Sequence, residues 1–147
     1  MMNKQALATG SRWWLTRGLA VCLLVASPLG AWSQSSPAAN GVQSSAERGV
    51  TVKVTPRAFG APGTPWEFAV VLDTHSADLS DDLASSATLT TDDGRTFKPT
   101  NWQGSLPGGH HREGVLVFDG PAPRPGAIEL RIDRPGESAP RIFRWQL

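Results

Sequence analysis

The sequence predicts an all-β protein in which short antiparallel strands pack as a two-layered sandwich. Three observations support this fold class. Apolar and polar residues alternate in several short segments, which is the pattern of strands with one buried face. Turns rich in Gly, Pro, Asp and Asn separate those segments. No stretch of helical period is longer than a turn or two, so a layer of helices is not expected.

Seven segments have the alternation of strands: 50–54, 66–72, 88–91, 95–98, 115–118, 128–132 and 143–147. The second is the clearest, because large apolar residues recur at every other position from Trp66 to Leu72. Between the third and fourth segments, Asp92-Asp93-Gly94 predicts a hairpin turn, since its glycine can adopt positive φ. About seven short antiparallel strands are typical of a single immunoglobulin-like β-sandwich.

The inward faces of these strands predict one shared core, consisting of Trp66, Phe68, Val70, Leu72, Val115, Val117, Ile128, Leu130, Ile132, Phe143 and Trp145. The segment 115–118 is ambiguous, because Leu116 and Phe118 make an opposite face that is equally apolar. One helical turn could lie within residues 76–86, with Asp78 or Ser80 as its N-cap.

Residues 1–33 have the organisation of a signal peptide. They carry three basic residues and no acidic one: Lys4, Arg12 and Arg17. An apolar run over 19–25 follows, and the small residues Ala31 and Ser33 suit cleavage before Gln34. The run is shorter than the roughly 20 apolar residues of a membrane-spanning helix, which favours cleavage over a retained anchor. The sequence therefore predicts a periplasmic or secreted protein with no membrane attachment after cleavage.

Composition divides the remaining chain into a tether and a domain. Residues 34–48 contain mostly Ser, Ala, Gln, Asn and Gly, too little apolar surface to offset the entropy of ordering, so we expect a flexible tether. Residues 49–147 form the β-sandwich domain. The single cysteine, Cys22, lies in the predicted signal peptide. The exported chain would therefore have no disulfide, cysteine nucleophile or thiolate metal ligand.

The charge and the motifs of the sequence limit the classes of function to be considered. The whole chain has a net charge of +1, and loss of the three basic residues of the signal peptide would leave −2. No basic face for nucleic acid is evident. Neither a Gly-x-Ser-x-Gly turn, a phosphate-binding glycine loop nor a His-Glu-x-x-His helix occurs, so we expect a non-enzymatic protein.

All three histidines lie at strand ends. His75 follows the strand over 66–72, and His110 and His111 precede the strand over 115–118. In immunoglobulin strand order these two strands are neighbours, which would bring the histidines to one end of the sandwich. Imidazole binds zinc and copper, and Asp73 or Asp78 could complete a site. The alternative is that the histidines are structural and only hydrogen-bond to nearby backbone.

Two functions remain open. The first is an exported binding domain for a transition metal such as zinc or copper, held by His75, His110, His111, Asp73 and Asp78. The second is an interaction module for another exported protein or a carbohydrate, acting through the same end or through Trp102. We place Trp102 in a loop, where it could either cover the core or present the flat face of its ring to a sugar or a partner protein.

A few motifs give this chain a resemblance to known exported domains: Leu72-Asp73-Thr74-His75-Ser76, Asp92-Asp93-Gly94, Asn101-Trp102 and Pro107-Gly108-Gly109-His110-His111-Arg112-Glu113-Gly114. Together they resemble a family of small prokaryotic immunoglobulin-like domains of unknown function, over about residues 49–147. The hairpin is also loosely similar to telokin-like immunoglobulin domains of exported bacterial proteins. The resemblance implies a fold and a location, and no activity.

Overall fold

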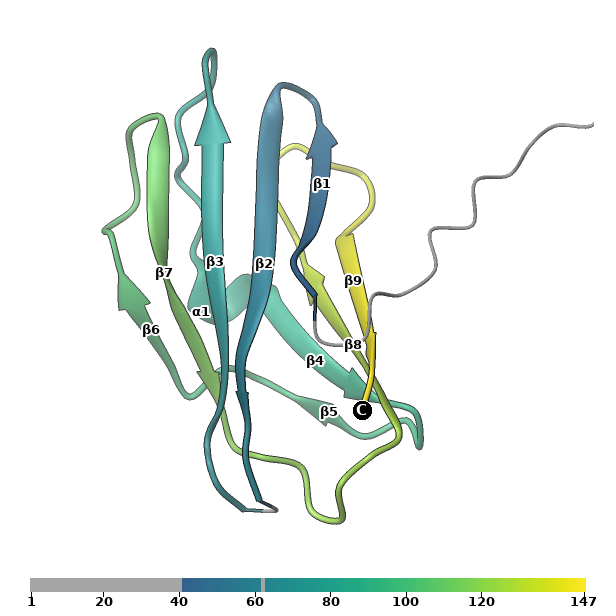
Figure 1. The fold of residues 1–147 in the computed structure, drawn as a ribbon. Helices are drawn as coiled ribbons and strands as arrows, with labels where there is room; N and C mark the ends of the chain where they lie inside the picture. Colours follow the sequence, from purple (N-terminus) through teal and green to yellow (C-terminus); the bar gives the residue numbers. More distant parts are fainter. Residues whose placement is uncertain (1–40, 62) are drawn as a thin grey trace, which may run out of the picture. The chain divides into compact units, whose positions relative to one another are not determined.

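The computed structural model describes residues 41–61 and 63–147, which form two antiparallel sheets (Figure 1). The predicted signal peptide, its cleavage site, Cys22 and most of the predicted tether lie outside these residues. The elements are β1 (Gln43–Glu47), β2 (Val50–Phe59), β3 (Trp66–Thr74), α1 (Leu83–Ser86), β4 (Ala87–Thr91), β5 (Thr96–Phe97), β6 (Asn101–Gly104), β7 (His111–Phe118), β8 (Ala127–Ile132) and β9 (Arg141–Gln146). Among the described residues, no helix is both long and apolar enough to cross a membrane.

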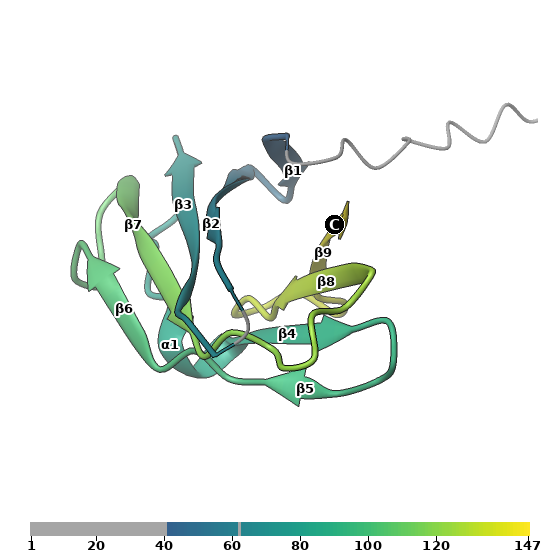
Figure 2. The ribbon, with the colours of Figure 1, turned by 60° about the horizontal axis from the view of Figure 1, so that its bottom comes forward.

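The strand order confirms the predicted sandwich. One sheet has the order β1-β2-β3-β7-β6 and the other β5-β4-β8-β9, and Figure 2 shows them as two layers. Apart from β1, the first sheet follows immunoglobulin strands A, B, E and D, and the second follows C′, C, F and G. The predicted hairpin is also present, because β4 and β5 pair on either side of residues 92–94.

Two strands were not predicted. The first, β1, lies within the segment predicted as a tether, of which the structure describes residues 41–48. Its sequence, QSSAE, has no apolar alternation, and backbone pairing with β2 holds it in place. The Gln43 side-chain amide also bonds the backbone of Arg144 on β9 and so joins the two sheets. The second, β6, contains Trp102, so the prediction that Trp102 lies in a loop is wrong.

Trp102 lies on the edge strand β6 and packs against the core. Its side chain is half-buried, and its indole N–H donates to the carbonyl of Ser105 at 3.0 Å. The ring covers the paired glycines Gly104 and Gly114, where an added Cβ would come within 2.6 to 2.7 Å of it. A side chain has no room at these two positions, because the indole and the backbone of the paired strand occupy that space.

The core contains the predicted residues with one correction. Val115 and Val117 are only half-buried, whereas Leu116 and Phe118 are buried. The register of β7 on β3 decides this, since Leu116 lies opposite Phe68 and Phe118 opposite Trp66. Trp66 and Trp145 are buried as predicted, and the three alternating valines of β2 are buried with them.

The connection between β3 and β4 closes one side of the core. Its leucines Leu79 and Leu83 are buried with the strands. The helix α1 begins after Asp82, whose carboxylate accepts hydrogen bonds from the backbone N–H groups of Ala84 and Ser85. The N-cap is therefore Asp82 rather than Asp78 or Ser80, because the helical turn starts later than predicted.

Candidate functional site

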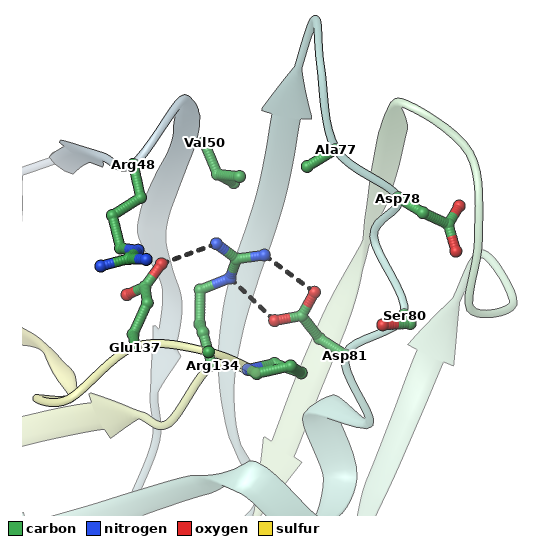
Figure 3. A pocket seen from close by; sticks show the side chains of 10 residues that line it. Arg48, Val50, Ala77, Asp78, Ser80, Asp81, Arg134 and Glu137 are labelled. Atoms are coloured by element: carbon green, nitrogen blue, oxygen red, sulfur yellow. Dashed lines mark hydrogen bonds and ion pairs between the residues drawn. The ribbon is translucent and has the colours of Figure 1, made fainter.

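Four connections lie at the end of the sandwich where β3 ends and β7 begins (Figure 1). They are the turn at residues 48–49 and the loops at residues 75–82, 105–110 and 133–140. We call this region the loop end. Between Arg48, residues 77–81 and residues 134–137 it contains a pocket of about 160 Å³ (Figure 3). All the histidines and both candidate aspartates lie at this end.

The predicted neighbourhood of β3 and β7 brings Asp73 and His111 together. The two residues are directly opposite each other in the sheet, and Nδ1 of His111 lies 2.5 Å from Oδ1 of Asp73. On the other side of the ring, Nε2 lies 3.8 Å from a carboxylate oxygen of Glu113. The hydrogen bond to Asp73 raises the pKa of His111 above its ordinary value. The pair is exposed, with side-chain accessibilities of 55% and 46%.

The other predicted ligands have different surroundings. His75 and His110 are exposed, and their side chains make no hydrogen bond or ion pair with the rest of residues 41–61 and 63–147. Asp78 accepts a hydrogen bond from the backbone N–H of Gly109 at 2.8 Å, so it joins two loops. The described part of the chain contains no group of three or more His, Cys, Asp or Glu residues arranged to hold a metal ion.

A buried ionic network lies beneath the loops, and sequence reasoning missed it. Arg134 donates two hydrogen bonds to Asp81, at 2.7 and 3.0 Å, and a third to Glu137 at 2.9 Å (Figure 3). Glu137 accepts two more from Arg141, at 2.6 and 2.7 Å. These bonds connect the β3–β4 loop, the β8–β9 loop and the start of β9.

Arg141 is the centre of this network. Its side chain is fully buried, and besides Glu137 it donates to the backbone carbonyls of Ser45 at 3.0 Å and Glu47 at 2.8 Å. It therefore fixes β1 to the rest of the sandwich. The hydrogen bond from Arg141 lowers the pKa of Glu137, and Glu137 raises the pKa of Arg141.

A second buried arginine, Arg112, connects two loops of the same end. It donates to the carbonyls of Leu79, Asp81 and Ser105, at 3.1, 2.6 and 3.2 Å, and its guanidinium lies 5.9 Å from the ring centre of Trp102. One sequence signal could have identified Arg141, because it is in phase with the inward residues Phe143 and Trp145 of β9 and alternation places it inside. Arg112 is in phase with Leu116 and Phe118 of β7, the face that alternation had not assigned to the core.

Leu106 stands out on the loop between β6 and β7, because it is 85% exposed although the loop on both sides of it is fixed. Before it, the backbone N–H of Ser105 donates to the carbonyl of Glu113, and the carbonyl of Ser105 accepts hydrogen bonds from Trp102 and Arg112. After it, Gly108 donates its N–H to the carbonyl of Leu79 at 2.8 Å. Sequence analysis did not single out this residue.

The chain matches no protein-family model, no curated protein and no solved structure. The fold alone does not identify a function, because immunoglobulin-like sandwiches carry many unrelated ones. A function therefore has to be inferred from the residues of the loop end.

Proposed function

We propose that this protein is a non-enzymatic binding domain that acts outside the cytoplasm and binds another exported protein through its loop end. The observation that carries this proposal is Leu106, a large apolar side chain exposed on a loop that is fixed on both sides. Loops held by a rigid scaffold are the usual place for binding residues.

The fixed loop favours binding in two ways. Its backbone is already ordered by hydrogen bonds, so a partner would not have to supply the free energy of ordering it. An apolar side chain that enters a partner's pocket loses its contact with water, which gives a favourable hydrophobic contribution. The exposed rings of His75 and His110 lie at the same end and can supply polar contacts around such an anchor.

Photo-crosslinking tests this function. A photoreactive phenylalanine analogue is placed at position 106 of the protein in its native host, and adducts are isolated from the exported fraction. We expect one dominant protein adduct, and we expect wild-type protein added in excess to suppress it.

Position 142 is the matched control, because Ile142 is also an exposed large apolar residue, 37% accessible, but it lies on the outer face of the four-stranded sheet and not on a loop of the loop end. The same analogue at 142 should give no such adduct. An equal adduct from both positions, or none from 106, would contradict binding through the loop end.

A second candidate function is binding of zinc or copper at the His111–Asp73 pair, which is favoured by the contact between these two potential ligands. His75 or Glu113 would have to move to provide a third ligand. A metal must displace the proton from Nδ1 of His111, and Asp73 raises the pKa of that ring. We therefore expect any metal affinity to increase as the pH rises through the titration of His111.

Calorimetric titration with Zn²⁺ and Cu²⁺ checks this second function. Binding should occur with one ion per chain and should be lost in His111→Ala. His110→Ala is the matched control and should retain binding, because its ring does not contact the pair. A wild-type protein that binds neither ion at neutral pH would exclude this function.

A further inference from the structure

The outer face of the five-stranded sheet has a regular arrangement of side chains. Backbone register places Lys53 of β2, Val71 of β3 and Glu113 of β7 in one row across the sheet. The next row contains Thr55, Ala69 and Val115. Because residues directly opposite each other share a face, these side chains all point away from the core.

The centre of this face is apolar. Ala69, Val71, Val115 and Val117 form one contiguous block on β3 and β7, and each is half-buried by its neighbours on the sheet. A shallow depression of about 340 Å³ lies over Ala69, Val71 and Val115 of this block, between Arg57 on one side and Glu113 on the other. Sequence alternation had assigned both valines of β7 to the core, so the exposure of Val115 to this depression needs an explanation.

Charged side chains flank the block with opposite signs on its two sides. Lys53 and Arg57 lie on β2, whereas Glu113 lies on β7. Within the described residues, the side chains of Lys53 and Arg57 make no hydrogen bond or ion pair, and the carboxylate of Glu113 has only the contact of 3.8 Å with His111. Both cations are therefore available to a carboxylate of another molecule.

We propose that two copies of this chain associate face to face through this outer surface, with a two-fold axis running along β3. Such an axis places Lys53 of each copy opposite Glu113 of the other, so the row forms the same ion pair twice. Val71 and Ala69 of the two copies then pack against each other at the centre. Arg57 lies in the bulge of β2 next to Ala58, the residue opposite Glu67, and offsets the charge of the two Glu67 side chains near the axis.

A second copy of the chain fits this surface because the charges on the two sides of the face are complementary to each other. The positive side of each copy meets the negative side of the other when the two-fold axis runs along β3, whereas an axis across the strands would place β2 on β2. Sheets readily pack face to face. This axis also keeps the strand direction of the two copies the same. The two loop ends therefore point the same way, and a partner with two binding sites could engage both.

Sedimentation equilibrium of the full exported chain tests this association. We expect wild type to be a reversible dimer. Lys53→Glu and Glu113→Lys should each raise the dimer Kd by roughly tenfold or more, because each places like charges opposite each other twice. The double variant should restore the wild-type Kd, since it re-forms both ion pairs with exchanged signs.

Val71→Asp provides an independent test, because it puts two carboxylates at the centre of the interface and should give a monomer. Ile142→Asp is its matched control on the opposite sheet and should remain a dimer, with thermal melting used to confirm that both variants are folded. A monomeric wild type would overturn the proposal. A dimer that neither charge reversal nor Val71→Asp weakens would also overturn it, as would a double variant that stays as weak as the single ones.

Discussion

Replacing Trp66 with alanine is expected to lower the free energy of unfolding by roughly 3 to 5 kcal/mol. The indole is fully buried and packs 5.0 Å from the ring of Phe59, measured between ring centres. Removing it leaves a cavity that the surrounding strands can fill only in part. A domain of this size usually has about 5 to 15 kcal/mol in total, so the variant would be close to unfolding.

Urea denaturation, followed by the fluorescence of the remaining tryptophans, measures this loss. Trp66→Phe is the matched control, because it keeps an aromatic ring in the core. The indole N–H of Trp66 has no hydrogen-bond partner in the described residues, so the phenylalanine variant loses volume only. We expect its loss to be about 1 to 2 kcal/mol. A loss below about 1 kcal/mol for the alanine variant would show that Trp66 is not part of the core.

Strand alternation predicted most of the core from the sequence, and β7 shows its limit. Both faces of β7 are apolar, so the period of two cannot distinguish Val115 and Val117 from Leu116 and Phe118. Pairing with β3 makes the choice, because a shift of one residue would exchange the faces. That pairing is a tertiary contact, and it cannot be predicted from the residues of β7 alone.

The two missed strands have the same explanation. β1 has almost no apolar residue, and it is ordered by backbone bonds to β2, by the donors of Arg141, and by the hydrogen bond that the side chain of Gln43 accepts from the backbone N–H of Arg144. β6 has only four residues, too few to show a period. Both strands pair with the strand that follows them in the chain, and β1 depends in addition on Arg141 and Arg144, which are far away in the sequence. The local residues show neither kind of partner, so propensity alone favoured a tether and a loop.

The site was predictable only where it depended on strand order. The proximity of Asp73 and His111 followed from the expected neighbourhood of two strands, and the structure contains that contact. The buried arginines were missed because charged residues are seldom fully buried unless paired. Their partners, such as Asp81 and Glu137, come from loops whose approach only the complete fold defines.

Replacing Arg141 with alanine should destabilise the domain by roughly 3 to 5 kcal/mol, as expected when one partner of a buried ion pair is removed. The change leaves the carbonyls of Ser45 and Glu47 without their donor. It also leaves the carboxylate of Glu137, whose side chain is 5% exposed, with Arg134 alone. We expect β1 to detach first, which hydrogen exchange at residues 43–47 would detect.

Acid titration of the same variant checks the electrostatic part of this effect. The pKa of Glu137 is lowered in the folded protein, chiefly by the hydrogen bond from Arg141, from an ordinary value of 4.5. A carboxyl group whose pKa is lower in the folded than in the unfolded protein stabilises the fold at pH values above its unfolded-state pKa. This contribution is lost as the pH falls through its folded-state pKa. Wild type should therefore lose stability below about pH 4.5, and Arg141→Ala should lose less over the same interval because its Glu137 is less strongly stabilised as an anion.

Arg144→Ala is the matched control for both measurements, because it removes an arginine of the same strand that is 60% exposed and pairs with Glu129. Exposed ion pairs contribute little, so its loss at neutral pH should stay within about 1 kcal/mol. Urea denaturation at neutral pH and at several acidic pH values compares the three proteins. If Arg141→Ala lost no more stability than Arg144→Ala, the buried network would not be what fixes β1 and the β8–β9 loop to the sandwich.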